Sequence, residues 1–481
     1  MPAPAFDGFK DLGFDALGRV IDNAAGHHRT LPVNYRYQVA GPVPQHTDAV
    51  ATLFLSKGNA FPTHLVSKEY LHAAKIPNWL KKTIFVNMKK RFVSLDVLRG
   101  ITIAFMCIVN NPGTWSHIFP PLRHAGWVGC TPTDLVYPFF IFCMGCAMAF
   151  SFSSREGNDA KTYLKVLKRG ALIFLVGLAL NLYPFFPVSP HDETWSFGQN
   201  YLYWLQHKRI FGVLQRIGMA YALGGCLAVW LKKPGKILGA VGVLCVLYTA
   251  ILLLFGREPG AFTLEGNVSM RIDEWLVGGD HCYHGYSGTN FDPEGLLGSM
   301  TAACTCLLGY LIGSMIIRSR DRMAATWAEG TSTQANGSPD LVRIQNSPDR
   351  VTVRIFVYGC LCLAFAMVLS IWIPISKPLW SASYVFYAGG WAMVALAFLM
   401  YVVDLKGHAK PFEPFRAMGM NPLMAFVCSG VIAKSYQFFN FSPSRYFGAN
   451  EYTSLLYALI FVTVIFSILW VLYRKHIVIK L

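Results

Sequence analysis

Ten apolar segments, each close to the length that a helix needs to cross a bilayer, recur along this chain of 481 residues. A hydrocarbon core about 30 Å thick requires about 20 apolar residues in a helix, and only helices or closed barrels satisfy their backbone groups there. The sequence therefore predicts an all-α fold, a polytopic membrane bundle of about ten transmembrane helices. The segments lie near residues 95–111, 132–152, 163–184, 209–231, 236–256, 294–317, 353–374, 382–404, 418–438 and 454–473.

Composition supports the membrane class and argues against a nucleic-acid-binding protein. Hydrophobic residues make up 54% of the chain and charged residues 14%, too few to cover a soluble protein of this length. The formal net charge of +16 is spread in short clusters between apolar segments, which is typical of membrane topology. The twelve cysteines lie mostly inside apolar segments and show no spacing of a disulfide framework.

The distribution of Lys and Arg predicts the orientation of the bundle. Basic clusters mark one set of segment ends, at residues 89–91, 155–169, 232–236, 318–322, 406–416 and 474–480. Lys and Arg accumulate on the cytosolic side, and the number of expected spans is even, so both termini are expected to be cytosolic. The connection 111–130 then faces the lumen or exterior, as does the loop 257–293 with its glycosylation triplet at Asn267.

Composition also divides the chain into four parts. Residues 1–88 form a polar N-terminal region expected to be cytosolic, and the Lys and apolar residues near its end predict either an interfacial helix or a partly ordered tail. Residues 89–318 hold the first six expected spans, and residues 353–481 hold the last four. Between them, residues 319–352 are rich in Ser, Asn, Gly and Pro, which is typical of a flexible linker, here cytosolic.

Polar side chains gather around the connection 111–130, at depths where they are expensive in lipid. His124 precedes the second span; it is either an ordinary loop histidine or a group that takes a proton or an acyl group. Asp134 either orients that imidazole or is an acid favoured by the helix dipole. Asn110 lies where Pro112 and Gly113 end the first span, so its amide either belongs only to helix termination or also holds an oxyanion or a sugar hydroxyl.

Asp96 and Arg99 lie three residues apart at the cytosolic end of the first span. That spacing places them on one helical face, where they are expected to form an ion pair. Contact with an anionic cofactor that enters from the cytosol is the alternative for this pair.

A second polar group is expected at the external ends of the fourth and sixth spans. Gln215 and Arg216 lie a few residues inside the fourth span, and Asp292 and Glu294 open the sixth. An arginine at that depth needs a carboxylate, carbonyl groups or a ligand phosphate. Asp292 and Glu294 are the two acids with which Arg216 could pair if its partner is a carboxylate.

No metal site is expected. His281, Cys282 and His284 are three ligand types at irregular spacing without a second cluster, which argues against zinc. The sequence also has no phosphate-binding Gly-rich loop and no GxSxG or HExxH motif.

Seven motifs resemble, in order, the catalytic membrane domain of the heparan-α-glucosaminide N-acetyltransferase family, and are closest in style to its bacterial relatives. They are RFVSLDVLRGITI, VNNPGTW, RHAGWVGCTPTDLVYPFFIFCMG, GVLQRIGMAY, FDPEGLLGS, SKPLWSASYV and GMNPLMAF. The resemblance covers roughly residues 89–476 and makes that region a membrane acyltransferase domain. Trp127 and Asn421 lie within these motifs and join Asp96, Arg99, Gln215, Arg216, Asp292 and Glu294 as candidate substrate- or cofactor-binding residues.

The resemblance implies an enzyme that takes an acetyl group from cytosolic acetyl-CoA and passes it to the amine of a glucosamine-type sugar on the lumenal side. The family's active histidine corresponds to His124, and a family asparagine and aspartate correspond to Asn110 and Asp134. His124 would either carry the acetyl group covalently or act as general base in direct transfer.

The family resemblance also bears on partners and place. It implies an amino-sugar or heparan-type glycan acceptor, acetyl-CoA as co-substrate, and a homodimer in the lipid bilayer. The membrane would be lysosomal or another endomembrane in a eukaryote and the plasma membrane in a bacterium. The alternative function is an amino-sugar transporter without acyl chemistry, because interior charges in a multi-span bundle are also typical of transporters.

Overall fold

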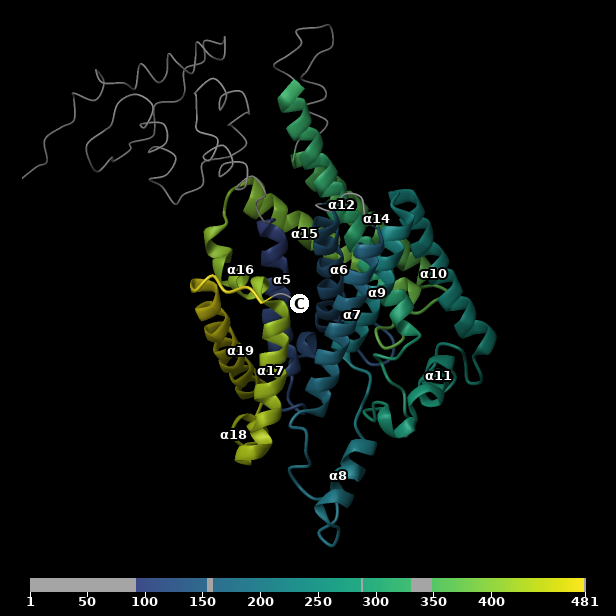
Figure 1. Cartoon of the computed structure of the whole chain (residues 1–481), viewed down its shortest axis with the longest axis vertical. Coiled ribbons are helices and arrows are strands. Elements are labelled where there is room, and N and C mark those ends of the chain that lie inside the picture. Colours follow the sequence, from purple (N-terminus) through teal and green to yellow (C-terminus); the bar gives the residue numbers. More distant parts are fainter. Residues whose placement is uncertain (1–91, 154–158, 287–288, 330–347, 480–481) are drawn as a thin grey trace, which may run out of the picture. The chain divides into compact units, whose positions relative to one another are not determined.

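The computed structural model describes residues 92–153, 159–286, 289–329 and 348–479, and this part of the chain is helical (Figure 1). Its only β-type pairs are two isolated bridges, Gly129 with Ser376 and Tyr286 with Thr289. The all-α prediction is therefore confirmed. The N-terminal region 1–88, with its expected interfacial helix, lies outside the described residues.

The long helices follow the apolar segments of the sequence. They are α5 (Val93–Asn110), α6 (Pro132–Phe152), α7 (Asp159–Leu182), α9 (Val213–Leu231), α10 (Pro234–Phe255), α12 (Gly298–Glu329), α14 (Pro348–Leu369), α15 (Ala382–Leu399), α17 (Pro422–Ser435) and α19 (Glu451–Arg474). Shorter helices are α8 (Phe197–Gln206), α11 (Val268–Val277), α16 (Glu413–Met420) and α18 (Pro443–Phe447). Single turns are η4 (Pro120–Leu122), η5 (Gly279–His281), η7 (Lys410–Phe412) and η8 (Tyr436–Phe439), and a π-helical segment, η6 (Met400–Leu405), extends α15.

Eight of the described helices are long and apolar enough to cross a membrane, which confirms a polytopic helical membrane protein. A ninth span is present if the pair Lys410–Met420 and Pro422–Phe439, bent by 72°, counts as one broken span. The expected third span forms α7, a helix of 24 residues that is not among the eight. Its N-terminal half carries Lys161, Lys165, Lys168 and Arg169, which lower its mean hydropathy.

The expected linker 319–352 is partly helical where the structure describes it. Helix α12 continues to Glu329, and α14 begins at Pro348. Only residues 330–347 separate the two helices, and they lie outside the described part of the chain.

Helix α5 packs against α6, α15, α16 and α19. Its contact with α16 is exceptionally close, because a Cβ atom added at Gly100 would lie 1.7 Å from the carbonyl oxygen of Phe415. A Cβ at Gly419 would likewise lie 1.8 Å from the carbonyl oxygen of Asp96. Small residues let the backbones of membrane helices approach in this way. This crossing fixes the helix that ends at Asn110.

Replacing Gly100 by Ala should destabilise the bundle, since the new methyl group would overlap backbone that cannot move aside. Overpacking of this kind costs about 1–3 kcal/mol, so the thermal unfolding temperature of the purified protein should fall. The control is Gly239→Ala in α10, where no atom lies within 4 Å of the added Cβ. Equal unfolding temperatures for the two variants would contradict the close-packing account.

Candidate active site

The first turn of α6 is built around the carboxylate of Asp134, which is 1% exposed. Its Oδ2 accepts hydrogen bonds from the backbone N–H and the hydroxyl of Thr131, both at 3.0 Å, and from the N–H of Ala125 at 3.0 Å. Pro132 begins the helix, a position where its missing N–H costs nothing. Asp134 therefore accepts hydrogen bonds from the donors at the start of α6. Through Ala125 it also attaches the connection 111–130 to this helix.

The other oxygen of this carboxylate holds His124. Asp134 Oδ1 lies 2.7 Å from His124 Nδ1, and Lys377 Nζ lies 3.0 Å from the same nitrogen and 3.3 Å from Oδ1. Because a carboxylate accepts and an ammonium only donates, the Nδ1 N–H is assigned as a donor to Asp134, and Lys377 is assigned as a donor to Asp134 Oδ1. This tautomer leaves Nε2 as the basic nitrogen. Both sequence interpretations of Asp134, helix-terminal acid and partner of His124, thus describe the same side chain.

Lys377 is the site residue that the sequence analysis did not select. It lies between α14 and α15, in a segment joined to the His124 connection by a hydrogen bond of 2.8 Å from Gly129 N to Ile375 O. Gly129 has a φ of 107°, which favours glycine. Two features of the sequence could have identified Lys377 as a site residue. It lies in the motif SKPLWSASYV, and it is one of few basic residues expected on the external side.

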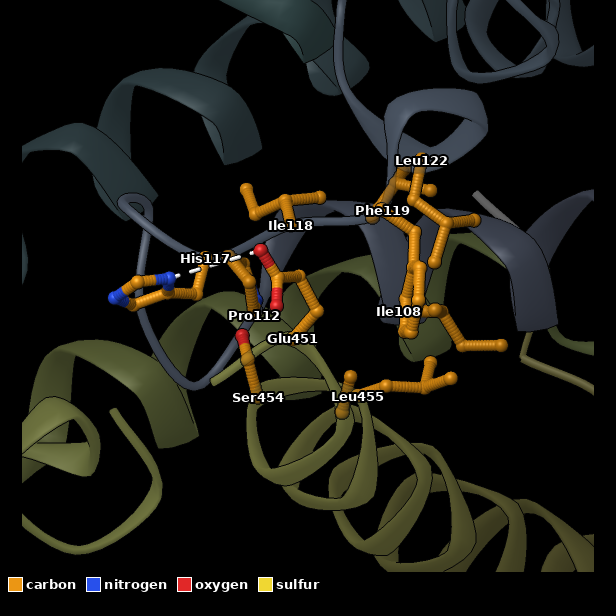
Figure 2. A pocket seen from close by; sticks show the side chains of 11 residues that line it. Ile108, Pro112, His117, Ile118, Phe119, Leu122, Glu451, Ser454 and Leu455 are labelled. Carbon is orange, nitrogen blue, oxygen red and sulfur yellow. Dashed lines mark ion pairs between the residues drawn. The ribbon is translucent and has the colours of Figure 1, made fainter. Parts of the chain in front are cut away.

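The connection that carries His124 is also held by α19, 340 residues further along the chain. Gly113 N donates to Ser454 O at 3.1 Å, and Thr114 N donates to Ser454 Oγ at 3.1 Å. Figure 2 shows the small apolar pocket beside this contact, where His117 Nδ1 and a carboxylate oxygen of Glu451 lie 3.7 Å apart. This contact fixes the course of the chain after Asn110.

His124 opens on a cavity of about 420 Å³. Of the residues selected from the sequence, the structure brings five to this cavity: Asn110, His124, Asp134, Arg216 and Glu294. Apolar side chains form much of the rest of its wall, including Met106, Phe140, Ile217 and Phe426. The wall also includes Thr102, eight residues before Asn110 and therefore about 12 Å further along the axis of α5. The cavity extends towards the middle of the bundle.

The two neighbouring asparagines at the end of α5 have different contacts. Asn111 Nδ2 donates to the carbonyl oxygen of Cys107 at 3.0 Å, so this residue terminates the helix. Asn110 instead lines the cavity. Its amide is thus placed to contact a ligand, while helix termination has its own residue.

The pairing of Arg216 with Asp292 or Glu294 does not form, because Arg209 takes both acids. Arg209 Nε and Nη2 donate to Asp292 at 2.9 and 2.6 Å, and Nη2 also donates to Glu294. Arg209 lies in the loop before α9, from which its side chain reaches both carboxylates. Residue spacing alone does not show which of the two arginines, Arg209 or Arg216, binds the acids.

This cluster keeps its charges although it is largely buried. Burial alone would raise the pKa of Glu294, but attraction to Arg209 and Arg216 outweighs it and lowers that pKa. Burial would likewise lower the pKa of Arg209, and the two acids raise it instead. The end of the bundle where α9 and α12 begin therefore holds a charged and internally paired network.

The remaining candidates lie away from the cavity. Asp96 and Arg99 form the expected ion pair at 3.1 Å in the first turns of α5, at the opposite end from Asn110. Trp127 Nε1 donates to Phe262 O at 2.6 Å, and Gln215 Nε2 donates to Ile210 O at 2.8 Å. In this structure the side chains of Trp127 and Gln215 stabilise the loops that carry Phe262 and Ile210.

Asn421 also has a structural position, at the break between α16 and α17. Its Nδ2 donates to Ile477 O at 2.9 Å, and its Oδ1 accepts from Ile479 N at 2.8 Å. The amide thereby attaches the C-terminal segment to the broken span, where Pro422 interrupts the helix.

The loop 257–293 changes the interpretation of Asn267. Asn267 is fully buried and caps α11, with Oδ1 accepting from Met270 N and Nδ2 donating to two carbonyl groups. This geometry leaves no room for a glycan, so the triplet gives no support to the orientation. His281 Nδ1 contacts Lys208 O at 2.7 Å, and burial raises the pKa of the Cys282 thiol to about 12. Over the described residues, no group of three or more His, Cys, Asp or Glu side chains is placed to hold a metal ion.

The comparisons with known proteins agree with the motifs. Residues 91–260 match the family model described as heparan-alpha-glucosaminide N-acetyltransferase, catalytic. This chain is similar to the heparan-α-glucosaminide N-acetyltransferases. It is 26% identical to the human protein of that name over 442 residues, which cover 80% of this chain and 59% of the human protein. It is 25% identical to the mouse protein over 399 residues, covering 72% of this chain and 54% of the mouse protein.

These matches confirm the predicted family resemblance, and the chain spans little more than half the length of the curated relatives. The matched part of this heparan-α-glucosaminide N-acetyltransferase relative extends from the start of α5 to just beyond α10. It contains His124, Asp134, Asn110 and Arg216, whereas Lys377 lies outside it.

Asp273 of α11 is a buried carboxyl group with a raised pKa. This carboxyl group is fully buried, accepts from Leu296 N at 2.9 Å, and has its pKa raised to about 7 from an ordinary 3.8, mainly by burial. Between pH 4 and 7 the folded protein therefore holds a proton that the unfolded chain has released, so stability decreases as pH rises through that window.

The unfolding temperature should consequently fall as the pH is raised from 5 to 8, and Asp273→Asn should flatten that dependence. Asparagine keeps the acceptor for Leu296 and cannot ionise. Thermal unfolding of both proteins across this pH range measures the effect. Identical slopes would show that Asp273 does not titrate in this window.

Proposed function

We propose that this protein is a transmembrane acetyltransferase that moves an acetyl group from cytosolic acetyl-CoA to the amine of a glucosamine-type sugar on the lumenal or external side. The observation that carries the proposal is the arrangement of His124, oriented by Asp134, at a cavity also lined by Asn110. The names of the human and mouse relatives support the transferase class and the amino-sugar acceptor.

His124 acts as the general base. With its Nδ1 proton directed to Asp134, Nε2 takes one proton from the neutral acceptor amine as the amine nitrogen attacks the thioester carbonyl carbon. The C–N bond forms, the C–S bond breaks, and the leaving thiolate receives a proton from the imidazolium. Asp134 stabilises the imidazolium during this exchange, and the Asn110 amide donates to the carbonyl oxygen as negative charge develops there.

The two ends of α5 have separate tasks in this proposal. Asp96 and Arg99 mark the cytosolic end, where the donor enters, and Asn110 marks the acceptor end. The cavity already extends from Asn110 to Thr102. A flexible thioester arm therefore has to cross only the part of the bundle between Thr102 and the cytosolic end.

Replacing His124 by Ala should reduce acetyl-CoA-dependent acetylation of glucosamine in membranes by about 100-fold or more, since a positioned general base contributes about 10²–10⁴. The matched control is His207→Ala, an exposed histidine of another external loop, which should keep wild-type activity. Equal product from wild type and His124→Ala would refute the assignment of this site. Transport of labelled glucosamine into vesicles without acetylation would favour the transporter.

Direct transfer, in which both substrates meet in the His124 cavity, is the route we propose in preference to a covalent carrier. At about 420 Å³ this cavity falls within the range of about 300–1,000 Å³ typical of ligand pockets. Incubation with labelled acetyl-CoA in the absence of acceptor should therefore leave His124 unlabelled, as measured by mass spectrometry of its peptide. Acetyl label on His124 that chases into glucosamine would contradict direct transfer and establish the covalent route.

A further inference from the structure

The side chain of Arg216 has hydrogen-bond donors that the described protein does not use. This residue of the first turn of α9 is 1% exposed and lines the same cavity as His124. A guanidinium carries five N–H groups, one on Nε and two on each Nη. Nη2 donates to the carbonyl oxygen of Gly295 at 3.1 Å, whereas Nε and Nη1 have no partner among the described residues.

The other two cations of the cavity wall are already engaged. Arg209 holds Asp292 and Glu294, and Lys377 lies within 3.3 Å of both His124 and Asp134. Arg216 therefore differs from them, because its charge is buried without a hydrogen-bonded carboxylate. Leaving donors of a buried charge unused is costly, and such a cost is expected where a ligand completes the site.

The guanidinium lies against an aromatic ring. Its central carbon lies 5.3 Å from the centroid of the Trp380 ring, and Trp380 Nε1 in turn donates to Thr305 Oγ1 at 3.2 Å. A guanidinium beside an aromatic face keeps its N–H groups at its edge, where they donate to carboxylate and phosphate oxygens. Arg216 lies in the first turn of α9, as Asp134 does in α6, so both belong to the external ends of their helices.

We infer that Arg216 is the binding group for an anionic oxygen group of a ligand that enters the His124 cavity. This subsite deepens the proposed function. It rests on that function only in treating the bound ligand as a substrate. The anion has two chemical sources: a carboxylate on a sugar acid linked to the amino sugar, or a phosphate of the donor. The position of Arg216 at the external end favours the sugar carboxylate.

Binding of small probes to the purified full chain tests the subsite without any acetyl transfer. Isothermal titration with glucuronate should give a dissociation constant at least ten times larger for Arg216→Gln than for wild type. Glucose, which carries no charge, should show no measurable binding to either protein. Arg445→Gln, which removes an exposed arginine of α18, is the matched control and should bind like wild type. If inorganic phosphate rather than glucuronate binds in an Arg216-dependent way, the anion is of the phosphate type. Equal binding of both anions by wild type and Arg216→Gln overturns the inference.

A second measurement uses only the wild-type protein, in case the variant does not fold. An anion seated at Arg216 occupies the cavity and should slow the reaction of diethyl pyrocarbonate with His124 at least threefold, with exposed His207 as internal control. Unchanged modification of His124 at saturating glucuronate and phosphate overturns the inference. Glucosamine acetylation without anion binding would refute the subsite alone, and anion binding without acetylation would refute the proposed function alone.

Discussion

The carboxylate of Asp134 is the group on which the candidate site depends. One oxygen receives three hydrogen bonds from the start of α6 and from Ala125, and the other contacts His124 and Lys377. A buried carboxylate is stable only when its oxygens are satisfied in this way. Because the same group begins a membrane helix and holds the imidazole, the position of His124 follows from the position of α6.

Charge pairing around Arg209 follows a similar principle. Arg209 binds two acids that lie close together in sequence, and Arg209 and Glu294 both line the cavity. Arg216 remains with unused donors beside it. The cavity thus combines side chains whose partners are present with Arg216, whose Nε and Nη1 have no partner among the described residues, which is the pattern expected of a ligand site.

Much of the fold was predictable from hydropathy alone. All ten apolar segments became helices, because a bilayer leaves the backbone of an apolar segment few other choices. Hydropathy predicted less well how each helix ends or bends: α7 carries too much charge to count with the other spans, and the segment near Asn421 is broken by 72°. The function of Asn267 was misread because a sequence triplet does not reveal whether its amide is already a helix cap.

The sequence by itself determined the membrane class, the positions of the helices and the short-range pair of His124 and Asp134, which lie ten residues apart. Local patterns suffice for these features because hydropathy and helix termini act within one segment. Only the tertiary structure decided that Lys377 joins this pair from 253 residues away, and that Arg209 rather than Arg216 binds the acids. Those contacts depend on which helices pack together and on the reach of each side chain, and neither is encoded in residue spacing.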